Sequence, residues 1–263
     1  MGEDAQQHID GLGGLFSLRG HRALVTGSVR GIGLDVARAL GLAGASVIVN
    51  GRRAETVGET VEVLHAEGIG ADPLVADLAV EEAVERLITA VGERTDILVN
   101  TIGARDRRGT RDMATAEFRA LVEVDLVSIY TLSRAIAARM VERGHAGRII
   151  NVSSVVGHLG KPDDVAYSAA KAGLEGLTRA MAADLGPYGI TVNAIAPGCI
   201  ATDTNRDLYE DPDWSSWLRR RTMLGRWGRP QEIAGIIVAL ASDAGSFITG
   251  QTIDVDGGLA ARF

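Results

Sequence analysis

The stretch RALVTGSVRGIG, residues 22–33, decides the fold of this 263-residue chain. A short apolar run typical of a buried strand leads into three glycines, and an amphipathic helical pattern follows. Glycines at such a junction allow a sharp turn and let the backbone approach a pyrophosphate, with the N-terminus of the helix aimed at its charge. Three glycines can also form a plain tight turn, so the rest of the chain must decide between the two interpretations.

Apolar runs and helical patterns alternate along the rest of the chain. The further runs lie at 46–50, 72–76, 97–100, 148–152, 191–195 and 252–255, and the clearest helical patterns lie at 80–94, 116–143 and 166–185. Continuous apolar runs are typical of parallel strands that are covered on both faces. We therefore predict an α/β fold of the Rossmann type, a doubly wound parallel sheet with helices on both faces. We expect residues 1–18 to form a tail and residues 19–263 to form one dinucleotide-binding domain.

The composition argues against several classes of partner. The formal net charge is −7, which gives no electrostatic footprint for nucleic acid or an anionic membrane. No run of about 18 apolar residues and no basic, apolar leader is present, so we expect a protein without a membrane span. The single cysteine, Cys199, fits a reducing cytoplasm. The five histidines show no metal-ligand spacing, so we predict no metal.

Several motifs follow one another in a familiar order. Thr26 precedes the spacing G-x-x-x-G-x-G, NTIG occupies residues 100–103, and YSAAK occupies residues 167–171. Together with Asp77, Ser154, Pro197-Gly198 and Thr202, they resemble the short-chain dehydrogenase/reductase family over roughly residues 18–258. The resemblance and the charge pattern together predict a cofactor site made of Gly27, Arg30, Gly31, Ile32, Gly33, Arg52, Asp77, Leu78, Asn100, Gly103, Tyr167, Lys171, Pro197, Gly198, Ile200 and Thr202.

The spacing of Tyr167 and Lys171 carries the proposed chemistry. Residues four apart share one face of a helix, and an ammonium group beside a phenol favours the phenolate. The resemblance implies that Tyr167 donates a proton to a carbonyl oxygen during reduction and removes it during oxidation. It also implies that Lys171 supports Tyr167 and holds the nicotinamide ribose, while Ser154 hydrogen-bonds the reacting oxygen. YxxxK on a helix is often only structural, but Ser154 and the glycine loop favour catalysis here.

Two positions depart from the family pattern. Asp125, in EVDLVS, stands where the family usually has an asparagine whose main-chain carbonyl helps to hold a relay water. The carbonyl is retained, so we keep Asp125 among the catalytic residues and expect its carboxylate to change the charge balance beside Lys171. Thr101-Ile102 replaces Asn-Ala and adds bulk beside the cofactor.

The second predicted strand indicates which cofactor is used. NAD enzymes commonly place an acid at its end, but here the strand ends in Asn50-Gly51-Arg52-Arg53. Arg52 and Arg30 could instead bind a 2′-phosphate, so NADP(H) is favoured over NAD(H). The alternative is that both are ordinary solvated surface arginines.

Sequence similarity also suggests a substrate. Residues 16–28, 49–53 and 210–235 resemble the gluconate 5-dehydrogenase subgroup, which implies interconversion of gluconate and 5-ketogluconate. Arg105, in a loop with three further arginines, is predicted to bind a sugar-acid carboxylate, although a solvated basic loop or a subunit contact is as plausible. His158 and Lys161 could reach substrate hydroxyls, but they differ from the Glu and Arg expected in that subgroup. Residues 202–227 are predicted to form a small helical substrate lid, or else plain surface packing.

Three alternatives stay open. A 3-oxoacyl reductase or another sugar or polyol dehydrogenase would keep the chemistry, and the segment SVVG at 154–157 is also seen in oxoacyl reductases. A non-catalytic regulator that senses NADPH would keep only the fold. The resemblance also implies a homotetramer built through the helices at 116–143 and 166–185, but their apolar residues suit a core contact equally well.

Overall fold

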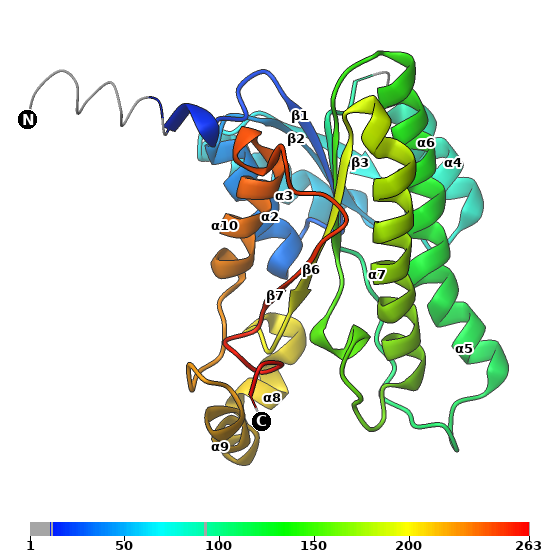
Figure 1. The fold of residues 1–263 in the computed structure, drawn as a ribbon, viewed down its shortest axis with the longest axis vertical. Helices are drawn as coiled ribbons and strands as arrows, with labels where there is room; N and C mark the ends of the chain where they lie inside the picture. The colour runs from blue at the N-terminus through cyan, green and yellow to red at the C-terminus, as the bar shows by residue number, and fades with distance from the viewer. Residues whose placement is uncertain (1–10, 12, 92–93, 263) are drawn as a thin grey trace, which may run out of the picture.

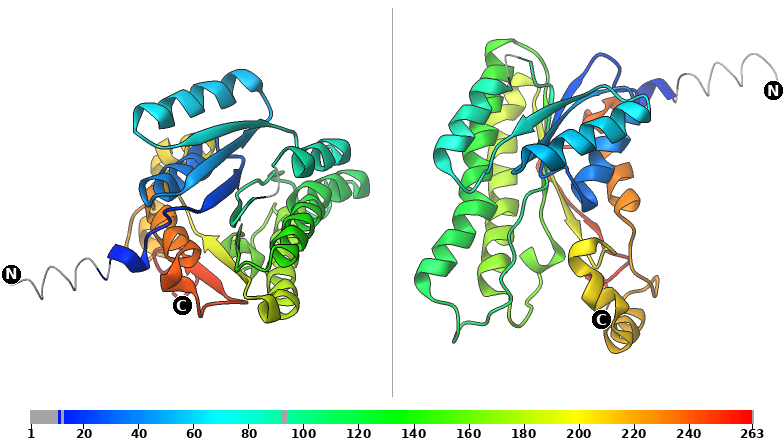
Figure 2. Two further views of the ribbon diagram at one scale, coloured as in Figure 1. Left: turned by 90° about the horizontal axis from the view of Figure 1, so that it is seen from above. Right: turned by 180° about the vertical axis from the view of Figure 1, so that it is seen from behind.

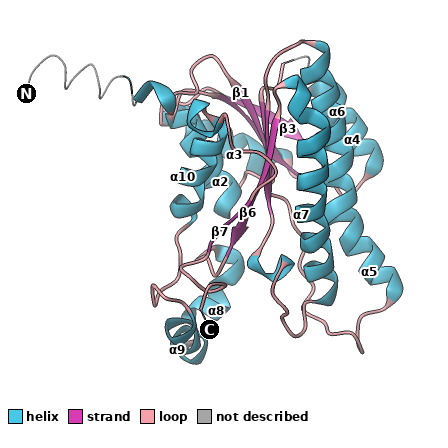
Figure 3. Ribbon diagram, viewed as in Figure 1, coloured by secondary structure: helices cyan, strands magenta, loops and turns pink. Residues whose placement is uncertain are grey.

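A seven-stranded parallel sheet forms the centre of the molecule (Figures 1 and 3). The computed structural model describes residues 11, 13–91 and 94–262. The strand order is β3-β2-β1-β4-β5-β6-β7, so the chain reverses direction across the sheet between β1 and β4. The strands are β1 (Arg22–Thr26), β2 (Ser46–Gly51), β3 (Ala71–Val75), β4 (Ile97–Asn100), β5 (Arg148–Val152), β6 (Thr191–Pro197) and β7 (Thr252–Val255). The predicted doubly wound sheet is confirmed.

Helices cover both faces of the sheet (Figure 2). One face carries α2 (Gly31–Leu42), α3 (Ala54–Ala66) and α10 (Pro230–Ala241), and the other carries α4 (Glu81–Ala90), α5 (Thr115–Val122), α6 (Ser128–Glu142) and α7 (Val165–Leu185). The central strands are buried on both faces, as their continuous apolar runs predict. Residues 92–93, inside the predicted helix 80–94, lie outside the described part. Within the part of the chain that the structure describes, no helix is both long and apolar enough to cross a bilayer.

The helix predicted over 116–143 is interrupted. A π-helical turn, η1 (Glu123–Val127), separates α5 from α6. A π turn adds a residue to the helical repeat and is frequent at functional sites. Asp125 lies inside this turn and is fully buried. The apolar pattern of the sequence continues through the turn, so periodicity alone predicted one uninterrupted helix.

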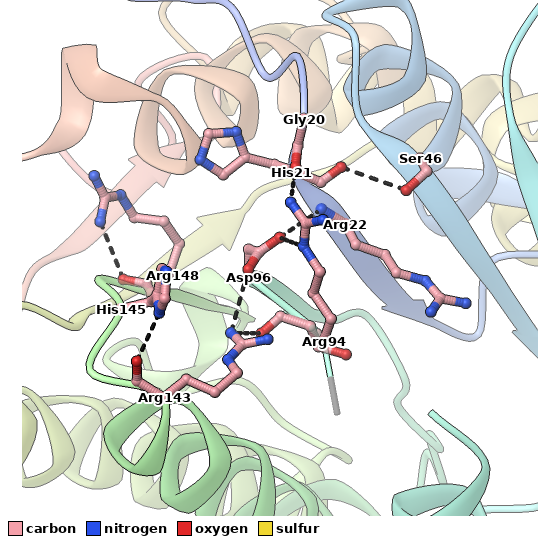
Figure 4. A network of polar contacts seen from close by, with 11 residues as sticks. Gly20, His21, Arg22, Ser46, Arg94, Asp96, Arg143, His145 and Arg148 are labelled. Carbon is pink, nitrogen blue, oxygen red and sulfur yellow. Dashed lines mark hydrogen bonds and ion pairs between the residues drawn. The ribbon is translucent and has the colours of Figure 1, made fainter. Parts of the chain in front are cut away.

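A polar network ties together the strand ends opposite the predicted site (Figure 4). Asp96 accepts a hydrogen bond from the backbone N–H of Arg22 at 2.9 Å and pairs with Arg143 at 3.2 Å. Leu18, in the predicted tail, is fully buried in the core, and its N–H donates to the carbonyl of Ala43 at 2.8 Å. Residues 1–10 and 12 of that predicted tail lie outside the described residues. This end of the sheet is therefore closed by internal contacts.

The carboxyl ends of the strands carry the predicted lid. The chain leaves the core at Ala201, forms η4 (Asp203–Asn205), α8 (Arg206–Glu210) and α9 (Pro212–Arg221), and returns at Gly228. Gly228 accepts from the N–H of Ala201 at 2.9 Å and donates to the carbonyl of Cys199 at 2.9 Å. Both ends of the excursion are thus fixed at one point beside β6, where ligands bind in open α/β sheets.

Candidate active site

The glycine loop connects β1 to α2 and has the backbone that the sequence predicted. Gly27 and Gly31 adopt φ values of +63° and +56°, a region that side chains rarely tolerate. A Cβ on Gly33 would lie 2.5 Å from the carbonyl oxygen of Gly27, so only glycine lets α2 begin this close to the loop. Ile32 is partly buried against the core. The loop therefore presents bare backbone at a helix N-terminus, which fits a pyrophosphate.

Gly33→Ala is expected to weaken NADPH binding at least tenfold and to lower stability by about 1–3 kcal/mol, because the added methyl overpacks the loop. Gly58→Ala is a matched control: it lies in α3, and a Cβ there would meet nothing within 4 Å. That control should keep or slightly raise stability. Thermal unfolding and titration with NADPH measure both effects. Equal behaviour of the two variants would contradict the role given to the loop.

The end of β2 supports the glycine loop without supplying an acid. Asn50 is buried, and its Oδ1 accepts from the N–H of Gly27 at 3.2 Å while its Nδ2 donates to the carbonyls of Leu74 and Ala76. Arg52 follows at the surface, and Arg30 is exposed at the N-cap of α2. Because β1 and β2 are adjacent and parallel, these two cations follow neighbouring strand ends.

Other predicted cofactor residues differ in where their side chains lie. Asn100 is buried, and its Nδ2 donates to Ser133 and Asn151 at 3.0 and 2.9 Å, so its side chain points into the protein interior. Leu78 is buried in the core, and Asp77 caps its own turn by accepting from the N–H of Ala79 at 3.1 Å. The side-chain nitrogen of Asn100 is thus engaged in internal hydrogen bonds.

Lys171 and Asp125 form a buried pair beside Gly103. Lys171 Nζ lies 3.5 Å from Asp125 Oδ2, and the two residues are 2% and 0% exposed. Lys171 also donates to the carbonyl of Val152 at 3.2 Å, and Asp125 Oδ1 accepts from the N–H of Ala104 at 2.6 Å. Burial raises the pKa of Asp125 above its usual range, although Lys171 opposes the shift. A Cβ on Gly103 would lie 3.3 Å from both charged groups, so Gly103 gives them room.

Tyr167 lies beside this pair on α7. Its ring centroid is 5.5 Å from Lys171 Nζ, which confirms that the two side chains share one face of the helix. The ring packs against Val155 and Val156, which directly follow Ser154. Ser154 begins the turn η2 (Val155–Gly157) at the end of β5. The structure therefore brings together the β5 end, Tyr167 and Lys171.

The three predicted substrate residues are all engaged with carboxylates of the chain. Arg105 Nε donates to Asp164 Oδ1 at 2.9 Å, and its Nη2 donates to the other oxygen. Lys161 pairs with the same carboxylate at 2.7 Å. His158 lies 3.3 Å from both Glu175 and Asp254. The Nε–Nη2 edge of Arg105 is thus occupied by Asp164.

The segment after β6 lies beside the glycine loop and leads into the predicted lid. A Cβ on Gly198 would lie 2.7 Å from Asp256, so the Pro197-Gly198 turn packs tightly on the C-terminal segment. Ile200 is buried. A Cβ on Gly31 would lie 3.8 Å from the side-chain methyl of Thr202, so Thr202 lies beside the glycine loop. The lid itself holds an aromatic cluster of Tyr209, Trp214, Trp217 and Trp227.

Sequence reasoning missed two buried acids. Glu175 lies four residues after Lys171 on α7 and accepts from Ser153 Oγ at 3.0 Å, so its helical spacing could have revealed it. Asp164 precedes α7 in a polar loop, and nothing in that loop marked it as buried. Among the described residues, no cluster of three or more His, Cys, Asp or Glu could hold a metal ion.

A hollow of about 470 Å³ lies between the 109–112 and 160–165 segments, lined in part by Arg111, Lys161 and Ser168. Ser154, Tyr167 and Lys171 do not line it. Lys161, which pairs with Asp164, is common to the hollow and to the group of residues around Tyr167.

The chain is similar to known proteins over nearly its whole length. The family described as enoyl-(acyl carrier protein) reductase matches residues 27–260. A gluconate 5-dehydrogenase of Gluconobacter oxydans is 39% identical over 249 residues, covering 93% of this chain and 96% of that protein. A 3-oxoacyl acyl-carrier-protein reductase of Pseudomonas aeruginosa is 41% identical over 248 residues, covering 93% and 99%.

A solved structure has the same fold. The gluconate 5-dehydrogenase of Burkholderia cenocepacia J2315, in complex with NADP and tartrate, is 40% identical with a TM-score of 0.91, covering 96% of this chain and 100% of that one. Together with the sheet and the motifs above, these matches show that the chain belongs to the short-chain dehydrogenase/reductase family and is an NAD(P)-dependent oxidoreductase acting on CH–OH groups.

Proposed function

We propose that this enzyme interconverts gluconate and 5-ketogluconate with NADP(H). The observation that carries the substrate class is the charge around Tyr167. Arg105 and Lys161, whose side chains are 31% and 33% exposed, share the single, fully buried carboxylate of Asp164, while Lys171 pairs with Asp125. The surplus positive charge suits an anionic substrate such as a sugar acid. Relatives named gluconate 5-dehydrogenase and 5-keto-D-gluconate 5-reductase support the specific choice.

The residues have separate roles in this proposal. The nicotinamide, when bound, supplies or accepts the hydride. Tyr167 donates the proton to the ketone oxygen, and Ser154 hydrogen-bonds that oxygen. Lys171 is held by Val152 and Asp125 so that its charge favours the phenolate of Tyr167. Lys161 and His158, at the rim of this group, are the proposed contacts of the substrate hydroxyls.

The preferred cofactor is tested at Arg30 and Arg52. Each charge-assisted hydrogen bond to a 2′-phosphate contributes about 1.5–3 kcal/mol, so Arg52→Ala is expected to raise the KM for NADPH roughly 10- to 100-fold. The KM for NADH should stay within about twofold, because NADH lacks that phosphate. Arg53→Ala is the matched control, because it removes the exposed arginine next to Arg52. A parallel loss with both cofactors would contradict the proposed phosphate contact.

Steady-state reduction of 5-keto-D-gluconate tests the proposed reaction. We expect turnover with NADPH that exceeds the turnover of ketones lacking a carboxylate. Absence of turnover, in a preparation that binds NADPH, would remove gluconate as the substrate and leave the family chemistry in place.

A 3-oxoacyl reductase is the second candidate. The 41% identical relative carries that name, and Met223 and Leu224 are exposed in the predicted lid, where an acyl chain could pack. Acetoacetyl thioester in the same assay distinguishes the two candidates by kcat/KM. Because the chain belongs to a family of oxidoreductases, we do not propose that it is a non-catalytic regulator.

We also propose a cytoplasmic homotetramer assembled through α5, α6 and α7. Val127, the last residue of η1, and Tyr130, in the first turn of α6, have exposed and largely apolar side chains, which supports a covered face. Light scattering should then give about four times the chain mass of 27.6 kDa. A mass equal to one chain would contradict this assembly.

A further inference from the structure

Arg105 makes a contact that substrate binding does not explain. Its guanidinium carbon lies 5.0 Å from the centroid of the Tyr167 ring, so the cation faces the ring of the catalytic tyrosine. The same guanidinium is fixed by two hydrogen bonds to Asp164. Asp164 is fully buried, while the side chain of Arg105 is 31% exposed.

The three residues connect two parts of the site. Arg105 belongs to the loop after β4, and Asp164 lies three residues before Tyr167, at the N-terminus of α7. The carbonyl of Asp164 also accepts from the N–H of Ser168 at 2.8 Å, so its backbone is part of the first helical turn. A buried carboxylate held in this way gives Arg105 one defined position. The guanidinium that faces the Tyr167 ring is therefore itself held in place.

Apart from Arg105 and Lys171, the packing partners of Tyr167 are apolar. Tyr167 is partly buried and packs against two small apolar clusters, one made of Val155, Val156, Ala196 and Leu259 and the other of Leu121, Ala166 and Ala170. These contacts have no directional preference, so they allow the phenol to shift. The guanidinium is the rigid, flat group beside the ring, and Lys171 Nζ is slightly farther from the centroid, at 5.5 Å.

We propose that Asp164 and Arg105 form a strut that positions the phenol of Tyr167 for proton transfer. Arg105 is then a positioning residue, and Asp164 acts through it. This role differs from the carboxylate clamp predicted from the sequence, because Arg105 acts here on the Tyr167 ring while Nε and Nη2 are bound to Asp164. The strut concerns the family's reaction on any ketone, so it does not depend on gluconate being the substrate.

The two roles of Arg105 make different kinetic predictions. A clamp would raise the KM for acidic substrates and leave neutral ketones unaffected. A strut lowers kcat for both kinds of substrate with little change in KM, because a misplaced proton donor slows the chemical step. The solvent deuterium isotope effect on kcat should also increase, since proton transfer then limits the rate more strongly.

The experiment compares Arg105→Ala, Asp164→Asn and the double variant as holoenzymes with NADPH. The ketones are 5-keto-D-gluconate and ethyl acetoacetate. We expect kcat to fall roughly 10- to 100-fold with both ketones, in line with the cost of misplacing a reacting group by about an ångström. The double variant should match the single variants, because the two residues act as one unit. Arg38→Ala, which removes an exposed arginine–carboxylate pair with Glu67 between α2 and α3, should retain wild-type kcat.

A second measurement tests the proposal even if the enzyme turns over neither ketone, or if Asp164→Asn does not fold. Tyrosine ring-carbon NMR of the NADPH complex follows four tyrosines, and Tyr167→Phe identifies the relevant signal. Arg105→Ala should shift or broaden the Tyr167 signal, and Arg105→Lys should do so as well, because lysine lacks the flat fork. An unchanged signal, or a KM effect confined to 5-keto-D-gluconate, would overturn the strut. Reduction of ethyl acetoacetate without reduction of 5-keto-D-gluconate would instead reject only the proposed substrate.

Discussion

Tyr167→Phe is expected to lower kcat about 10²- to 10⁴-fold, the usual contribution of a positioned general acid. The ring would still pack on Val155 and Val156, so the fold and the NADPH affinity should remain those of the wild type. Stopped-flow rates of NADPH oxidation, together with a fluorescence titration of NADPH, measure the two quantities separately. Ser153→Ala is a useful comparison, because it also removes one hydroxyl group, but one that donates a hydrogen bond to Glu175 inside the protein.

Retention of more than a tenth of the wild-type kcat in Tyr167→Phe would contradict the assignment of Tyr167 as the proton donor. A loss of NADPH binding in the same variant would show that the hydroxyl acts in binding instead.

Lys171→Met is expected to lower the free energy of unfolding by about 3–5 kcal/mol, because it leaves the fully buried Asp125 carboxylate without its cation. It should also abolish detectable turnover. The double variant Lys171→Met/Asp125→Asn should recover most of the stability, since no uncompensated charge remains, and should stay inactive. Urea unfolding of the four proteins in the cycle gives the coupling free energy.

The loss of stability in Lys171→Met should also depend on pH. Burial raises the pKa of Asp125 in the folded protein, and removing Lys171 removes an opposing effect and raises it further. The folded variant then holds the proton over a range in which the unfolded chain, with a pKa of about 3.9, has lost it. Stability therefore falls as the pH rises through that range, so the variant should be closest to the wild type in acid. A pH-independent difference would contradict a charged Asp125–Lys171 pair.

The sheet was predictable because parallel strands buried on both faces leave a continuous apolar signature. All seven strands were found, with ends within two residues, from runs such as Ile97–Asn100. The glycine loop was predictable for a related reason, since the positive φ values of Gly27 and Gly31 need glycine. The strands and the glycine loop both depend on local constraints, so a short stretch of residues is enough to predict them.

The side-chain pairing within the site was not predictable in the same way. Asp164 and Arg105 are 59 residues apart, and only the folded chain shows that one binds the other. The polar row of Asn100, Asn151 and Thr178 lies inside the molecule, and nothing in the sequence indicated that the side chain of Asn100, predicted as a cofactor-site residue, would point there. Local residue patterns predict the backbone well, but partners chosen across the sheet depend on tertiary packing.

The most direct test of the account is the fate of the hydride. The enzyme is incubated with 5-keto-D-gluconate and NADPH deuterated at C4 of the nicotinamide, and the product is examined by NMR. The account predicts gluconate that carries deuterium at C5, formed about 10²- to 10⁴-fold more slowly with Tyr167→Phe. NADPH oxidation that yields no C5-labelled gluconate, or labelling that survives Tyr167→Phe at the wild-type rate, would contradict it.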